Sequence, residues 1–228
     1  MTVQAIVFDA YGTLFDVYSI ARLAEKLFPG KGDALATLWR DKQIEYSHLR
    51  TLCSMYKPFW EVTQDALVFS CRKLGLDLDL DAQQALMSQY AKLQPFPESL
   101  DVLQQLHEKG FRLALLSNGN PEMLEAVVKA AGMQQVLSHL LSVDSVKKFK
   151  TAPEAYQMAT DLFGVAAKNI LFVSSNCWDV CGASWFGYRT FWVNRNDAPL
   201  EELGVTPNGQ GRSLADLPAF AEKERATA

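Results

Sequence analysis

The sequence has few cysteines, and their spacing matches neither a zinc site nor a redox pair. Its 228 residues contain four, Cys53, Cys71, Cys177 and Cys181, with no C-x-x-C pair among them. Cys177 and Cys181 are four residues apart, which suits one face of a helix but not a zinc motif. In a chain of this size we expect all four to be small, buried apolar side chains.

Long apolar runs are also absent. No uninterrupted stretch approaches the ~20 residues that a membrane span requires. The segment from Met1 to Asp9 has no basic region, no extended apolar stretch and no A-x-A cleavage pattern, so no secretory signal is recognised there. We therefore expect a cytoplasmic protein with no membrane partner.

The chain carries little net charge and few histidines. Lys and Arg total 22 against 26 Asp and Glu, giving a net charge of -4. This balance offers no electrostatic reason to expect nucleic acid as a partner, although a local basic pocket could hold a small anion. The three histidines, His48, His107 and His139, fit no metal-ligand or triad spacing, and we interpret them as structural.

What the sequence does contain is a series of buried strands. Their apolar residues run continuously rather than alternating, which favours strands covered on both faces, as in a parallel sheet between helices. Asn120-Pro121 can cap and open a helix that ends near Gly132, and Pro153 can open another that ends near Gly164. The strands expected from this pattern are Ala5–Phe8, Arg112–Leu116, Leu140–Val143, Ile170–Val173 and Thr190–Val193.

The interval between the first and second strands has almost no strand character. It contains four amphipathic segments that we expect to be helical: Ile20–Phe28, Asp33–Met55, Trp60–Leu74 and Asp81–Leu93. The fold class predicted is therefore α/β, a doubly wound, Rossmann-like parallel sheet with an inserted helical cap domain. Residues 1–16 and 96–228 would form the core, and residues 17–95 the cap. The final residues, Ala221–Ala228, are expected to be a frayed helical end.

Ligands of open α/β sheets bind outside the carboxyl ends of the strands, so the residues there are informative. The first strand ends in the sequence FDAYGTL, and the second in LSNG. The sequence KKFK follows the third strand, and VSSNCWD ends the fourth. In this order and spacing, the four segments resemble the four motifs of the haloacid dehalogenase superfamily over nearly the whole chain.

Two departures point within the superfamily toward the L-2-haloacid dehalogenases. Superfamily phosphatases carry a second Asp two residues after the nucleophile, where this chain has Tyr11. Their fourth motif has an Asp that helps to bind Mg²⁺, at the position of Ser175 here, although Asp179 is retained. Asp9 and Asp179 alone would hold Mg²⁺ poorly, because the ion requires several anionic oxygens. The resemblance thus implies hydrolytic dehalogenation without a metal or cofactor.

The resemblance also implies a catalytic set. It makes Asp9 a covalent nucleophile that displaces halide and forms an ester, which water then hydrolyses. Lys150 would hold Asp9 ionised, and Asp179 would help to activate the hydrolytic water. The residues that complete this set, including those that would tether the two carboxylates, are Thr13, Tyr156, Ser174, Ser175 and Asn176.

A second group would bind the substrate. Arg40 and Asn118 would receive the departing halide. Phe59 and Trp178 would form an apolar wall around the alkyl group. Each of these four has an ordinary structural interpretation as well: Arg40 an exposed helix residue, Asn118 a helix cap, and the aromatic rings parts of the core.

The carboxylate of the substrate would be held by Ser117 and by the backbone around Tyr11. The substrate class implied is short-chain L-2-haloalkanoic acids, converted to D-2-hydroxy acids with inversion at C2. The family commonly forms dimers, so the resemblance also implies a homodimer.

Simpler interpretations of the catalytic residues exist as well, since Asp9 could cap a turn and Lys150 could be one more solvated lysine. The alternatives at the level of function are a metal-dependent phosphatase on the same fold and a catalytically silent protein that binds a small acid.

Overall fold

A parallel β-sheet forms the centre of the computed structural model, which describes residues 2–137 and 139–226. In this part of the chain the strands are β1 (Ala5–Phe8), β2 (Arg112–Ser117), β3 (His139–Ser142), β4 (Ile170–Ser174), β5 (Arg189–Val193) and β6 (Gly209–Gly211). Their order is β3-β2-β1-β4-β5-β6, and every neighbouring pair is parallel. This is the order of a doubly wound, Rossmann-like sheet, which confirms the predicted fold class.

Two details of the sheet differ from the sequence prediction. The third strand ends before Val143, which instead begins a short 3-10 helix. The strand β6 was not predicted, because three residues with two glycines have no apolar pattern. Its Gly209 lies so close to Phe220 that an added Cβ would approach the ring to 2.5 Å. This strand therefore depends on tertiary packing, which cannot be predicted from the local sequence pattern.

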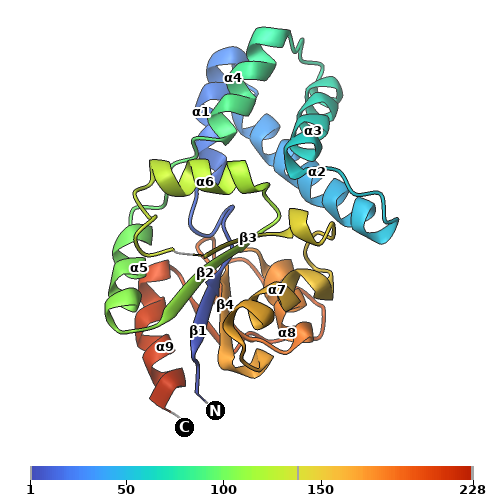
Figure 1. Ribbon diagram of the computed structural model, residues 1–228. Coiled ribbons are helices and arrows are strands. Elements are labelled where there is room, and N and C mark those ends of the chain that lie inside the picture. The colour runs from blue at the N-terminus through green and yellow to red at the C-terminus, as the bar shows by residue number, and fades with distance from the viewer. Residues whose placement is uncertain (1, 138, 227–228) are drawn as a thin grey trace.

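Helices cover both faces of the sheet. In Figure 1, α5 (Ser99–Glu108) and α9 (Leu217–Ala226) lie on one side of the strands, and α7 (Pro153–Phe163) and α8 (Cys177–Phe186) lie on the other. The remaining core helix is α6 (Pro121–Ala130). Both predicted proline starts are confirmed, and α7 ends at Gly164, whose φ of 63° is left-handed.

Two sequence predictions outside the sheet are wrong. The C-terminal helix does not fray from Ala221, because that residue is fully buried and Glu224 pairs with Arg189; residues 227–228 lie outside the described part. Of the cysteines, Cys71 and Cys181 are buried and Cys177 is half-buried, but Cys53 is exposed. Cys53 lies where a long helix ends and the chain turns, so it has no core to pack against.

The segment of residues 17–95, between β1 and α5, is helical, as predicted, and lies over the carboxyl edge of the sheet (Figure 1). Its helices are α1 (Ala21–Leu27), α2 (Gly32–Leu52), α3 (Phe59–Leu74) and α4 (Leu80–Tyr90). We call residues 17–95 the helical segment. The chain enters and leaves it at adjacent points, since the Asp16 N–H donates to Gln94 O at 2.8 Å and the Phe96 N–H donates to Leu14 O at 3.0 Å.

The helical segment packs on the sheet through a shared apolar cluster. Leu35, Trp39 and Phe59 belong to the same buried cluster as the strand residue Phe8. Tyr11, just after β1, lies between two rings of the segment, with its centroid 5.9 Å from Phe59 and 5.6 Å from Tyr90. Burial of aromatic surface on this scale holds the segment against the carboxyl ends of the strands.

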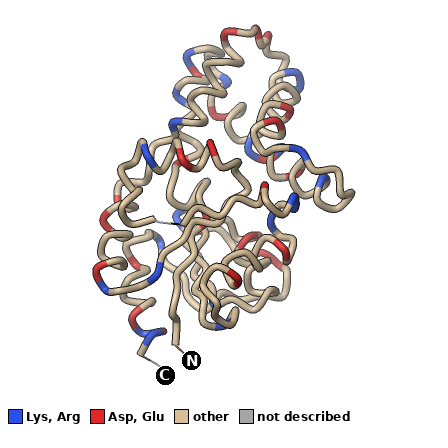
Figure 2. The backbone as a smooth tube through the Cα atoms, viewed as in Figure 1, with Lys and Arg blue, Asp and Glu red and all other residues tan. Residues whose placement is uncertain are grey.

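Charged residues are spread over both parts of the molecule. In Figure 2, Lys and Arg are interspersed with Asp and Glu along the core helices and along the helical segment. None of the helices that the structure describes has the length and apolar character needed to span a bilayer.

Candidate active site

The register of the sheet brings the polar strand ends together. Phe8 of β1 pairs with Leu115 of β2 and with Val173 of β4, so Asp9 follows at the level where those two strands end. The strand order reverses on either side of β1, which makes this edge the switch point of the sheet. Asp9 therefore occupies the position at which α/β proteins of this type bind ligands.

Lys150 lies between two carboxylates in the interior of the protein. Its Nζ is 3.0 Å from Asp9 Oδ1 and 2.9 Å from Asp179 Oδ2. Lys150 is 1% exposed and Asp179 is fully buried. The geometry excludes the solvated-lysine interpretation, because a buried ammonium requires partners of opposite charge. The peptide bond between Lys150 and Thr151 is cis.

Further donors surround the second oxygen of Asp9. The Thr13 hydroxyl donates to Asp9 Oδ2 at 2.8 Å, and Asn176 Nδ2 donates to the same oxygen at 2.9 Å. The Ser174 hydroxyl lies 3.5 Å from it. These donors hold the carboxylate of Asp9 in one orientation. Asp9 thus serves as an acceptor for residues from three separate segments, and does not cap a turn.

The turn after β1 depends on Gly12 and Ser175. Gly12 has a φ of 92°, which disfavours any residue with a Cβ, and an added Cβ would lie 3.2 Å from Ser175 Oγ. The Ser175 hydroxyl donates to Gly12 O at 2.6 Å, and its backbone N–H donates to Thr13 Oγ1 at 2.8 Å. Ser175 therefore ties the end of β4 to the loop that carries Thr13.

Asp179 lies behind Lys150, and both of its carboxylate oxygens have donors. The Tyr156 hydroxyl donates to Asp179 Oδ1 at 2.8 Å, and Lys150 occupies Oδ2. Burial raises the pKa of Asp179 to about 6, although Lys150 acts in the opposite direction. Burial alone would lower the pKa of Lys150, but the charges of Asp179 and Asp9 raise it above its ordinary value. Lys150 is accordingly a cation at neutral pH.

A narrow cavity adjoins Asp9 between the sheet and the helical segment. Seven of the predicted site residues line it together with Ile44 and Ser47: Asp9, Tyr11, Arg40, Phe59, Ser117, Asn118 and Trp178. The other seven lie in the hydrogen-bonded network around the two carboxylates. The fourteen residues singled out in the sequence therefore meet in one place, where two cations, Arg40 and Lys150, and several amide and hydroxyl groups surround two buried carboxylates.

Arg40 reaches this cavity from α2. Its Nη2 donates to Tyr11 O at 3.2 Å and to Asn176 Oδ1 at 3.4 Å, and its Nη1 donates to Gln43 Oε1 at 2.7 Å. Gln43 is fully buried and also accepts from the Tyr90 hydroxyl at 2.9 Å. Arg40 is thus held toward the core, and not exposed on the helix surface as its local sequence would allow.

The loop after β2 does not cap α6, which corrects the capping expectation. Asn118 Oδ1 accepts from the Lys150 backbone N–H at 2.9 Å, and Ser117 Oγ accepts from the Gly119 N–H at 3.1 Å. Asn120 occupies the N-cap position of α6 but makes no side-chain bond to that helix. Pro121 at the first helical position lacks an N–H, which reduces the need for a cap there. Ser117 therefore bonds within its own loop, Asn118 bonds to the loop that carries Lys150, and Asn120 bonds to the helical segment.

Comparison with known proteins agrees with this arrangement. The family model for haloacid dehalogenase-like hydrolases matches residues 3–187. The (S)-2-haloacid dehalogenase of Pseudomonas sp. (strain YL) is 46% identical over 212 residues, which cover 93% of this chain and 91% of the relative. This chain belongs to the haloacid dehalogenase-like hydrolases. It is therefore an enzyme of that family.

Solved structures of related haloacid dehalogenases match the fold of this chain over all or nearly all of its length. A crystal structure of an L-2-haloacid dehalogenase has a TM-score of 0.96 and 54% identity, covering 97% of this chain and 100% of the other. The L-2-haloacid dehalogenase of Xanthobacter autotrophicus, solved with chloropropionic acid covalently bound, has a TM-score of 0.91 and 36% identity, with both chains covered completely. The resemblance stated from the motifs is confirmed.

The donor set does not suit the magnesium ion used by phosphatases of this superfamily. Within residues 2–137 and 139–226, no group of three or more His, Cys, Asp and Glu side chains could hold a metal. The ammonium of Lys150 already lies between Asp9 and Asp179. Ser175, at the position of a phosphatase acid, uses its hydroxyl on Gly12 O. A divalent cation would have to displace Lys150, with a carboxylate pair as its only anionic ligands.

Sequence reasoning missed two residues that hold this haloacid dehalogenase site together. Gln43 lies three residues after Arg40 on the same helix, a spacing that could have suggested the contact. Arg195, after β5, donates from Nη1 to Gly12 O at 3.2 Å and from Nη2 to Thr13 O at 3.0 Å. No local signal marks Arg195, because the loop that it supports is far away in sequence.

Proposed function

We propose that this enzyme is an (S)-2-haloacid dehalogenase that acts on short-chain L-2-haloalkanoic acids through an ester on Asp9. The observation that carries the proposal is the buried ion pair at the cavity. Asp9, 3.0 Å from Lys150, borders the same cavity as Arg40 and Asn118. An anionic nucleophile, a cation to receive an anion and an apolar wall are what displacement of halide from carbon requires.

In the first half of the reaction, a carboxylate oxygen of Asp9 attacks C2 of the substrate. The new C–O bond forms as the carbon–halogen bond breaks, and the halide leaves with the electron pair. No proton is transferred, so no general acid is needed, in keeping with Tyr11 at the position of the phosphatase acid. Arg40 and Asn118 would receive the halide, while Ser117 and the backbone near Tyr11 would hold the substrate carboxylate.

In the second half, water attacks the carboxyl carbon of the Asp9 ester. The bond from that carbon to the ester oxygen breaks, and this oxygen, which came from Asp9, takes up one proton of the water and leaves as the hydroxyl group of the 2-hydroxy acid, while the Asp9 carboxylate is restored and the second proton is released. We propose that Asp179 helps to take the proton of the water. With Lys150 and Tyr156 on its two oxygens, it would act through the hydrogen-bonded network. The stereochemistry is determined in the first half, because attack of Asp9 on C2 from the face opposite the halide inverts the configuration at that carbon.

Incubation with the two enantiomers of 2-chloropropionate tests the substrate class and the stereochemistry. The (S)-acid should release chloride and give D-lactate, and the (R)-acid should give neither product at a comparable rate. The measurement is free chloride together with chiral chromatography of the product. Absence of chloride from both enantiomers would favour a silent protein that binds small acids, and L-lactate from the (S)-acid would contradict direct displacement.

Dialysis against EDTA tests the metal-dependent alternative. Because Lys150 supplies the charge between the two carboxylates, dehalogenation should be unchanged after dialysis and after addition of Mg²⁺. Hydrolysis of p-nitrophenyl phosphate serves as the control for phosphatase activity, and it should stay at background with or without the ion. A strict requirement for Mg²⁺ in either assay would contradict the site proposed here.

We also propose that residues 17–95 act as a cap domain over a core of residues 1–16 and 96–228, and that the enzyme is a cytoplasmic homodimer. The adjacent entry and exit points of the segment support the first division. The exposed apolar side chains of Leu49, Leu52 and Met55 at the end of α2 are compatible with a dimer contact.

A further inference from the structure

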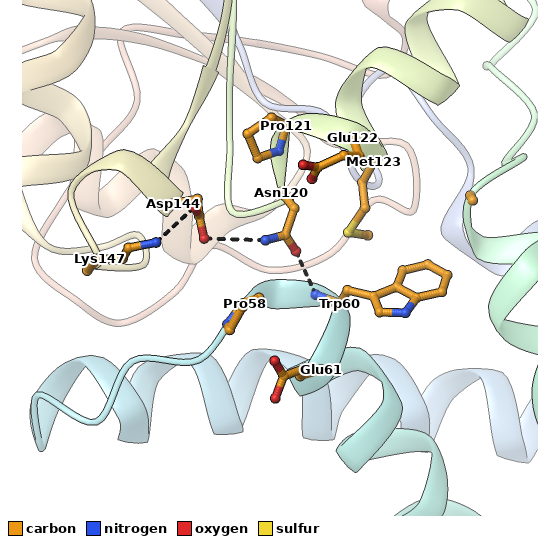
Figure 3. Close-up of a pocket in the computed structure, with 10 residues that line it drawn as sticks. Pro58, Trp60, Glu61, Asn120, Pro121, Glu122, Met123, Asp144 and Lys147 are labelled. Atoms are coloured by element: carbon orange, nitrogen blue, oxygen red, sulfur yellow. Dashed lines mark hydrogen bonds and ion pairs between the residues drawn. The ribbon is translucent and has the colours of Figure 1, made fainter.

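The helix α3 begins without a side chain of its own to cap it. The residue at its N-cap position is Pro58, which has no acceptor on its side chain, and α3 has no side-chain cap bond there. The first N–H groups of a helix have no partner within the helix and need one elsewhere. The Trp60 N–H finds its partner in the core, where it donates to Asn120 Oδ1 at 2.8 Å. Asn120 thus caps α3 across the boundary between the core and the helical segment (Figure 3).

Asp144 determines which way the amide of Asn120 points. Asn120 Nδ2 donates to Asp144 Oδ1 at 3.3 Å, and the same carboxylate accepts from the Tyr56 hydroxyl at 2.6 Å and from Lys147 Nζ at 2.9 Å. The Tyr56 hydrogen bond and then Lys147 lower the pKa of Asp144, so the group is an anion at neutral pH. A carboxylate only accepts, so Asn120 must turn its NH₂ toward Asp144 and its oxygen toward α3.

The capped residue adjoins the wall of the catalytic cavity. Phe59, immediately before Trp60, is 2% exposed and lines the cavity that Asp9 borders. Its ring centroid is 5.9 Å from that of Tyr11 and 5.9 Å from that of Phe149. Phe149 directly precedes Lys150, and Tyr11 lies two residues after Asp9, so the Phe59 ring packs on residues close in sequence to both members of the buried ion pair. The start of α3 therefore fixes how closely the wall approaches the nucleophile.

We propose that Asn120 and Asp144 are positioning residues that hold Phe59 in place and thereby set the size of the alkyl group that the enzyme accepts. This inference rests on the proposed function, because it assumes that a 2-haloacid occupies the cavity beside Asp9. Asn suits position 120 because its amide accepts from α3 through Oδ1 and donates to Asp144 through Nδ2 at the same time. An Asp there would keep the cap but would place two carboxylates together.

The test is an exchange of the two side chains. N120A removes the cap of α3. N120D keeps an acceptor for α3 but places a second carboxylate beside that of Asp144. Each should raise KM for 2-chlorobutyrate about fivefold, the factor that a typical lost helix cap represents, with kcat changed less than about twofold. The ratio of kcat/KM for 2-chloropropionate to kcat/KM for 2-chlorobutyrate should change in the same two variants. The double variant N120D/D144N restores one donor and one acceptor, so its KM should return to within about twofold of the wild type.

The matched control is E122Q, which alters an exposed carboxylate two residues after Asn120, in the pocket that Trp60 and Asp144 also line, and should leave both constants unchanged. A simple loss of stability would reduce the fraction of folded enzyme, so it would lower the apparent kcat of both single variants and leave KM unchanged. Wild-type KM and selectivity in N120A, or a double variant as impaired as N120D, would overturn the proposal.

Hydrogen exchange separates this inference from the proposed function. The amides in the first turn of α3 should exchange faster in N120A than in the wild type, while those in the middle of α3 should not change. This readout needs no turnover. Unchanged exchange would overturn the cap itself. Faster exchange in an enzyme that releases no halide from any 2-haloacid would leave the cap in place and overturn only its role in substrate choice.

Discussion

Lys150→Ala is expected to lower kcat by at least about 10³-fold, equivalent to about 4 kcal/mol of activation free energy. The lysine is the only cation within hydrogen-bonding distance of Asp9 and Asp179 among the described residues, and it is almost fully buried. Without it, two carboxylates share one buried site, and the pair retains a proton to higher pH. A protonated Asp9 does not displace halide.

The loss of Lys150 should also shift the pH dependence of kcat in a definite direction. Asp179 has a pKa raised by burial to about 6, so the wild-type rate should fall as the pH decreases through about that value. In Lys150→Ala this acid limb should move to higher pH, since removal of a cation favours the protonated acid. The measurement is kcat from pH 5 to 9, with thermal unfolding recorded to establish that the variant is folded.

Two variants control for the loss of Lys150. Lys148→Ala removes a nearby lysine whose Nζ bonds only to the Ser54 hydroxyl in the described structure, and it should retain wild-type turnover. Lys150→Arg restores the charge but presents a planar fork in place of a compact ammonium, so we expect little rescue. Near-normal turnover of Lys150→Ala with an unshifted pH–rate profile would contradict a catalytic role for Lys150.

A single turnover in ¹⁸O-labelled water, with enzyme in excess over (S)-2-chloropropionate, should place the label in the Asp9 carboxylate. The product lactate should carry unlabelled oxygen, because its hydroxyl oxygen comes from Asp9. Mass spectrometry of the peptide that contains Asp9 measures the incorporation. Asp9→Asn, which replaces the attacking oxygen pair by an amide, should be inactive, with a loss of at least about 10⁴-fold.

The control for the labelling experiment is the enzyme in the same water without substrate, whose Asp9 peptide should stay unlabelled. Label found first in lactate would mean that water attacks C2 directly, with Asp9 as a general base. Label in Asp9 and a product that carries none would distinguish the two routes in one experiment.

The fold could be predicted largely from local patterns, and the candidate site residues from the order of the four motifs and the resemblance that they carry. Continuous apolar runs identified β1 and β4, and the polar residues at their ends, Asp9 and Ser174, meet because parallel strands end at one edge. The family resemblance supplied Arg40, which no local feature of α2 distinguishes. The structure then places its guanidinium at the cavity.

Contacts between distant segments could not be predicted in the same way. Asn120 has the sequence context of a cap for α6, and its use by α3 depends on how the helical segment lies on the core. Arg195 follows β5, which lies two strands away from β1, and it donates to the carbonyls of Gly12 and Thr13. The short strand β6 forms because Gly209 permits the approach of Phe220, a contact absent from any local pattern.

The adjacent entry and exit of the helical segment have a consequence for how such a protein can diverge. Because Asp16 pairs with Gln94 and Phe96 with Leu14, the segment is attached to the sheet as a closed loop whose ends touch. Residues can be added to or removed from the interior of such a loop without shifting the register of β1 against β2. The part that lines the cavity beside Asp9 can therefore change in length and sequence while Asp9 and Lys150 keep their positions.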